Sequence, residues 1–168
     1  MRYIFTTAVI AASFIACTSN EDKPASTTET AHDAHASTTS AGVTDNSPLP
    51  EIPSNARIYF VNLKDGQTVT SPLKVEMGVE GLQVDTANGV LKPASGHHHI
   101  LVDIDSIATG VIVPPTDSVH HYHFGKAQTS GEVKLTPGKH TLVLQFADAR
   151  HRSFGTRLTS KITVDVKQ

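Results

Sequence analysis

The chain has 168 residues, of which 38% are hydrophobic and none is tryptophan, and its formal net charge is −2 with histidine neutral. This length suffices for one ordinary domain with additional segments. The acidic excess lies before residue 55, and the rest of the chain is nearly neutral without a basic run. This distribution argues against nucleic-acid binding.

Residues 1–17 have the pattern of a secretion signal. Arg2 precedes an apolar run too short to span a bilayer as a mature helix, and the stretch ends at the chain's one cysteine, Cys17. Its end, FIAC, resembles the bacterial lipobox, in which the cysteine is acylated and becomes the new N-terminus, although Phe14 stands where Leu is usual. We therefore expect a lipoprotein signal peptide and a membrane anchor at Cys17, because several acyl chains anchor a protein stably. An ordinary cleaved signal peptide with a chance cysteine is the alternative.

Residues 18–54 are rich in Ser, Thr and Ala and contain no aromatic residue. Such a composition buries too little apolar surface to offset the entropy lost on ordering, so we expect a disordered tether. No Asp follows Cys17, which by analogy with lipoprotein sorting predicts the outer membrane. The domain beyond the tether would face the periplasm or the cell surface.

From residue 55 to 168 the pattern changes to that of β-strands. LKVEMGVEG places Leu73, Val75, Met77 and Val79 on one face and charged residues on the other, as a half-buried strand does. ARIYFVN, HHHILVDI, HHYHF, EVKL, KHTLVLQFA and LTSKITVDV are further predicted strands, separated by Pro and Gly. We predict an all-β fold, an immunoglobulin-like antiparallel β-sandwich of about seven strands. His140, at the position of the tyrosine corner in such folds, is expected to be a structural histidine bonded to the backbone.

Six of the ten histidines lie in two short stretches, GHHHILVDI and VHHYHFG. Alternate residues of a strand face opposite sides, so His98 shares its face with Ile100 and Val102, and each stretch offers a His-x-His pair. Two such pairs on neighbouring strands would supply three or four imidazoles to copper or zinc. The predicted metal ligands are His97, His99, His121 and His123.

Other interpretations of these histidines remain open. Asp103 or Asp105 is near enough in sequence to orient a ligand. PGKHTLVLQFADARH is loosely similar to the end of small periplasmic copper-carrier sandwiches, whose ligands would correspond to Asp148 and His151. A polar loop joining the last two strands is the simpler interpretation of DARHRSFG. Without a metal, the histidines are structural or pH-responsive, because imidazole becomes charged just below neutral pH.

Residues 56–166 also resemble a bacterial family known as domain of unknown function 4399. The resemblance is carried by YFVNLKDGQTVTSPLKVEMGVEGL, GHHHILVD, HHYHFGKAQT and PGKHTLVLQFADARHRSFG. It implies a secreted or lipid-anchored β-sandwich and brings no established activity. The sequence contains no arrangement of Ser, His and acid typical of an enzyme, so we expect no catalytic activity. Two hypotheses remain: a metal-binding lipoprotein, and an immunoglobulin-like module whose loops at 82–96 and 105–118 bind a protein or glycan partner.

Overall fold

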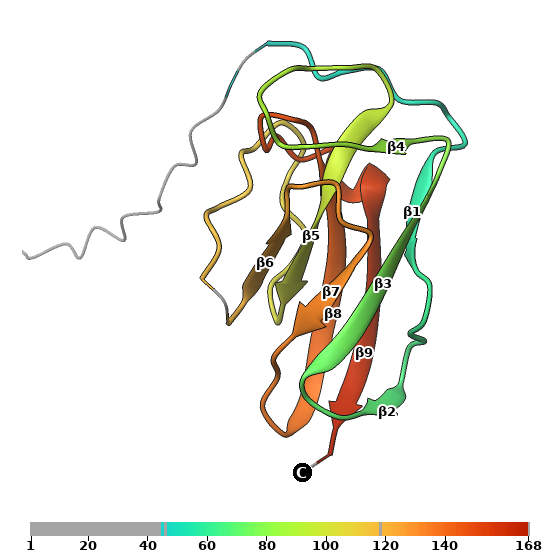
Figure 1. Ribbon diagram of the computed structural model, residues 1–168, viewed down its shortest axis with the longest axis vertical. Helices are drawn as coiled ribbons and strands as arrows, with labels where there is room; N and C mark the ends of the chain where they lie inside the picture. Colours follow the sequence, from blue (N-terminus) through green and yellow to red (C-terminus); the bar gives the residue numbers. More distant parts are fainter. Residues whose placement is uncertain (1–44, 46, 118, 168) are drawn as a thin grey trace, which may run out of the picture. The chain divides into compact units, whose positions relative to one another are not determined.

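The computed structural model describes residues 45, 47–117 and 119–167 (Figure 1). The expected signal peptide, the expected lipid anchor at Cys17 and most of the expected tether lie outside these residues. Within the described ranges, no helix has the length and apolar character that crossing a membrane requires.

Two β-sheets make up the domain (Figure 1). The smaller sheet has the order β1 (Arg57–Phe60), β3 (Leu73–Glu80) and β7 (Ser130–Val133), and both pairs are antiparallel. The larger sheet has the order β2 (Gln67–Val69), β9 (Thr159–Val166), β8 (Gly138–Ala147), β5 (Ser95–Val102) and β4 (Gln83–Val84). The strand β6 (His121–Phe124) also pairs with β5, and a short 3₁₀ turn, η1 (Gly155–Leu158), precedes β9.

The all-β sandwich predicted from sequence alternation is confirmed, with two differences in detail. The described residues contain nine strands where about seven were expected. The larger sheet is mixed, because β2 runs parallel to β9 and β4 runs parallel to β5. The strands β2 and β4 have three and two residues, too few for an alternating pattern to reveal them.

The hydrophobic core lies between the two sheets. Of the four apolar residues that the alternation of β3 predicted, three are buried in the core and Val79 packs against it partly buried. β5 contributes Ile100 and Val102. His98 shares this inner face of β5 and is fully buried. Its ring meets Phe146 edge-on, with the ring centroids 5.1 Å apart, and neither ring nitrogen has a hydrogen-bond partner among the described residues. The core therefore contains a histidine that is held only by packing.

The strand β5 is buried on both faces, because a second layer covers its outer side. Residues 103–117 and the loop of residues 148–154 form this layer, and backbone hydrogen bonds join the two segments. Gln145 of β8 ties the first segment, and the η1 turn that follows the second, to the sheet. Its Oε1 accepts a hydrogen bond from the Ile107 backbone N–H at 3.1 Å, and its Nε2 donates to the Gly155 carbonyl at 3.2 Å. The outward-facing side chains of β5 are therefore shielded from water.

Candidate metal centre

Five histidine rings meet where this covering layer packs against β5 and β6. β5 contributes His97 and His99, β6 contributes His121 and His123, and the loop after β8 contributes His151. In the antiparallel register of β5 and β6, His99 lies opposite His123. The ring centroid of His97 lies 4.6 Å from that of His99, 5.0 Å from that of His123 and 4.9 Å from that of His151. We call these five residues the histidine cluster.

All four histidines predicted as ligands belong to this cluster, because β5 and β6 are neighbours and present their His-x-His pairs on one side. That they bind a metal stays a prediction. The sequence pattern predicts a polar loop around His151, and the loose similarity to copper carriers is the one signal in the sequence that marks His151 as a ligand. Asp148, the other residue of that similarity, lies outside the cluster and pairs with Arg152.

Neither aspartate that was expected to orient a ligand does so. Asp103 directly follows β5 and has a φ of 57°, and its carboxylate lies 2.7 Å from His140 Nδ1. Asp105 pairs with Lys161 at 3.1 Å. The orienting role is therefore wrong for both residues, because the chain turns away from the cluster where β5 ends. The structural role expected for His140 is confirmed, since its Nε2 donates a hydrogen bond to the Thr136 carbonyl at 2.9 Å.

A chain of hydrogen bonds runs through three rings of the cluster and ends on a backbone carbonyl. His121 Nδ1 lies 3.1 Å from the Pro115 carbonyl oxygen, which can only accept, so this nitrogen donates. In the neutral ring, His121 Nε2 then accepts from His99 Nδ1 at 2.8 Å. His99 Nε2 accepts in turn from His97 Nε2 at 2.9 Å. This order leaves a free lone pair on His97 Nδ1, which is buried without a hydrogen-bond partner among the described residues.

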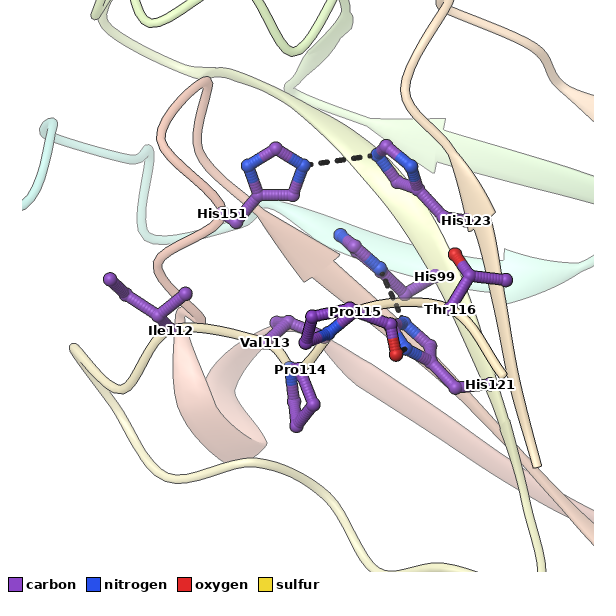
Figure 2. A pocket seen from close by; sticks show the side chains of 9 residues that line it. All are labelled: His99, Ile112, Val113, Pro114, Pro115, Thr116, His121, His123 and His151. Carbon is purple, nitrogen blue, oxygen red and sulfur yellow. Dashed lines mark hydrogen bonds between the residues drawn. The ribbon is translucent and has the colours of Figure 1, made fainter. Parts of the chain in front are cut away.

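His97, His123 and His151 have the spacing of metal ligands. One ring nitrogen from each lies within 4.8 Å of the other two. The Nε2 atoms of His123 and His151 face each other at 3.2 Å (Figure 2). Two ligands of a tetrahedral zinc ion lie about 3.3 Å apart, given Zn–N bonds of about 2.0–2.1 Å. The separation of the two Nε2 atoms therefore suits a shared ion.

A buried ion pair holds the loop that carries His151. Asp148 accepts hydrogen bonds from the backbone N–H groups of Arg150 and Arg152, and its other oxygen lies 2.8 Å from Arg152 Nε. Both side chains of this pair are fully buried. The Arg152 guanidinium also donates to the Ser47 carbonyl at 2.6 Å and to the Ser47 hydroxyl at 2.7 Å. These contacts keep His151 in a left-handed backbone conformation, with φ at 65°.

The His123 ring depends on a glycine two residues further along the chain. A Cβ atom placed on Gly125 would lie only 2.2 Å from His123 Nε2. This contact is shorter than van der Waals packing permits, so any larger residue would displace the ring. Gly125 therefore leaves the space in which the His123 imidazole turns toward His151.

A pocket of about 310 Å³ borders the cluster (Figure 2). Four cluster rings form one wall and the segment 112–116 forms the other, so the pocket lies between β6 and the covering layer. The described residues that line it include no acidic side chain, lysine or arginine. They are His99, Ile112, Val113, Pro114, Pro115, Thr116, His121, His123 and His151.

Four rings of the cluster, those of His97, His99, His123 and His151, favour the neutral form. Burial, followed by the nearby rings of His151 and His123, lowers the pKa of His97 to about 3. Burial is also the main cause that holds the pKa of His99 well below its usual value. The pKa values of His123 and His151 are lowered by burial too, although the charge of Asp148 opposes this effect at His151. Neutral imidazole is the form that binds metal ions, so at neutral pH these four rings have the protonation state that a metal ligand requires.

The comparisons with known proteins identify a family without adding an activity. No curated protein and no solved structure matches the chain at a significant level. A protein-family model described as "Domain of unknown function (DUF4399)" matches residues 75–167, which include the whole histidine cluster. Because this match spans more than half of the chain, the protein belongs to the DUF4399 family, as its sequence motifs indicated.

Proposed function

We propose that this protein is a membrane-anchored extracytoplasmic binding lipoprotein that coordinates one divalent metal ion, copper or zinc. The observation that carries the proposal is the convergence of His97, His123 and His151, whose ring nitrogens lie within 4.8 Å of one another. Imidazole suits both zinc and copper, and a set of three histidines is a known arrangement for zinc.

The hydrogen-bond chain divides the cluster into ligands and supporting residues. His97 offers Nδ1 to the ion, because its Nε2 is already bonded to His99. His99 and His121 do not bind the ion in this arrangement. They support His97 through hydrogen bonds that end at the Pro115 carbonyl. Histidine ligands in proteins usually donate their second N–H to such a partner, which fixes the ring orientation and raises its basicity. The four-ligand set predicted from sequence alone is the competing arrangement.

Metal binding also accounts for the cost of the arrangement. A buried nitrogen without a partner, such as His97 Nδ1, costs about 1–3 kcal/mol of folding free energy. Protonation cannot relieve this cost, because the neighbouring rings and burial oppose a charge on His97. A metal ion that accepts the lone pair satisfies the nitrogen and ties the covering loop, through His151, to the two strands.

In this proposal the protein binds the metal and is not an enzyme. The lipobox at Cys17 would attach the chain to the outer membrane, and the tether would hold the metal-binding domain away from the bilayer. Metabolic labelling with a radioactive fatty acid tests the anchor directly. We expect label and membrane association in the wild-type chain and neither in Cys17→Ser. Label that persists in the variant would contradict the anchor.

Metal binding is tested on the full chain, purified in detergent through a tag without histidine and without chelator. We expect one equivalent of copper or zinc by elemental analysis, and a higher melting temperature when the metal is added. His123→Ala combined with His151→Ala should abolish both effects, because it removes two of the three proposed ligands, whose rings line the pocket. His120→Ala is the matched control, since His120 is exposed beside the same strand and lies outside the cluster. Failure of the wild-type protein to bind either metal would overturn the proposal.

A further inference from the structure

The three proposed ligands leave a bound ion incompletely coordinated. Both ring nitrogens of His99 are used in hydrogen bonds, and so are both of His121. The other described side chains around the pocket are hydrocarbon, apart from the hydroxyl of Thr116. Zinc in proteins takes at least four ligands, and a site with three protein ligands keeps its remaining position for an external one. Two of the proposed ligands, His123 and His151, line the pocket, so that position faces it (Figure 2).

The charge of the site selects the kind of external ligand. Three neutral imidazoles leave both positive charges of a divalent ion uncompensated. The Asp148 carboxylate acts electrostatically on the His151 ring, but the charge of Asp148 is already paired with that of Arg152. An uncompensated charge in a partly buried site with apolar walls is costly, and a bound anion lowers that cost.

We propose that the open coordination position of the metal takes a small monovalent anion, of the carboxylate or pseudohalide class, from the pocket beneath residues 112–116. This inference rests on the proposed function, because it needs the metal. Binding is a ligand exchange: a water molecule leaves the ion as a donor atom of the anion bonds to it, and no electrons are transferred. A volume of about 310 Å³ is about ten times that of one water molecule, about 30 Å³, so an anion of a few non-hydrogen atoms fits.

The probe is azide, added to the full chain loaded with one equivalent of copper(II). We expect a saturable azide-to-copper charge-transfer band with a stoichiometry of one azide per copper. Metal content is measured in the same samples, so that loss of copper to azide in solution is recognised. Acetate should compete with azide and reduce the band.

A variant in the pocket wall tests where the anion binds. Thr116 is exposed at the rim and is not a proposed ligand, and Thr116→Trp places a large side chain in the pocket. We expect normal copper content and azide binding weakened by roughly tenfold or more. Thr129→Trp is the matched control, because Thr129 is also exposed and does not line the pocket; it should bind azide as the wild type does.

The outcomes separate the two proposals. One equivalent of copper without any azide band would show a closed coordination sphere, which overturns this inference and leaves metal binding intact. Equal azide affinity in the wild type and in Thr116→Trp would overturn the assignment to this pocket. A wild-type chain that binds neither copper nor zinc would overturn the proposed function and this inference together.

Discussion

Acid sensitivity is the sharpest consequence of the buried histidines. Burial lowers the pKa of His97 to about 3 and that of His98 to about 4, from an ordinary value of 6.5. As the pH falls below 6.5, the unfolded chain takes up protons at these rings while the folded protein does not. The free energy of unfolding is therefore highest above pH 6.5 and decreases toward pH 4.

The magnitude follows from the size of these shifts. Each pKa unit corresponds to about 1.4 kcal/mol, so lowering the pH from 8 to 5 removes about 2 kcal/mol of stability for each of the two rings. The combined loss of about 4 kcal/mol is a large part of the 5–15 kcal/mol typical of a folded domain. His99 adds to this loss, since its pKa is also lowered by burial. Carboxylates contribute little above pH 5, because their ordinary pKa values lie near 4.

Urea unfolding at a series of pH values, with chelator present to remove metal, measures this effect. His98→Leu should lose about 2 kcal/mol less than the wild type between pH 8 and 5, because one titrating ring is gone. Leucine is a suitable replacement, since the His98 nitrogens make no hydrogen bond with the described residues. His120→Ala, which removes an exposed histidine, should behave as the wild type. Equal pH dependence in the wild type and His98→Leu would refute the claim that this ring stays neutral in the core.

Three further substitutions test the site. Arg152→Met should cost about 3–5 kcal/mol in urea unfolding, because it leaves the buried Asp148 carboxylate unpaired; a cost under about 1 kcal/mol would contradict the buried ion pair. Gly125→Ala should lower metal affinity in calorimetry while the protein stays folded, since the new Cβ displaces the His123 ring; unchanged affinity would refute this contact. His121→Ala should weaken metal binding by about 10–100-fold if His121 only supports a ligand, whereas complete loss would favour the four-ligand set.

The strands, and the face of its strand on which each histidine lies, could be predicted from the sequence because both depend on local geometry. Alternation along β3 predicted Leu73, Val75 and Met77 in the core, and alternation along β5 placed His98 with Ile100. A strand turns each successive side chain to the opposite face, whatever the rest of the chain does. The short strands β2 and β4 escaped prediction because two or three residues carry no period.

By itself, the sequence determined a β-sandwich with two His-x-His pairs, each on one face of its strand. Only the tertiary structure decided that the pairs lie side by side, that His151 joins them and that Asp103 turns away. Sheet order and loop path depend on hydrogen bonds between residues far apart in the chain, such as those of Arg152 with Ser47 and of Gln145 with Ile107. Such contacts have no local period, so the candidate metal centre becomes visible only when the chain is folded.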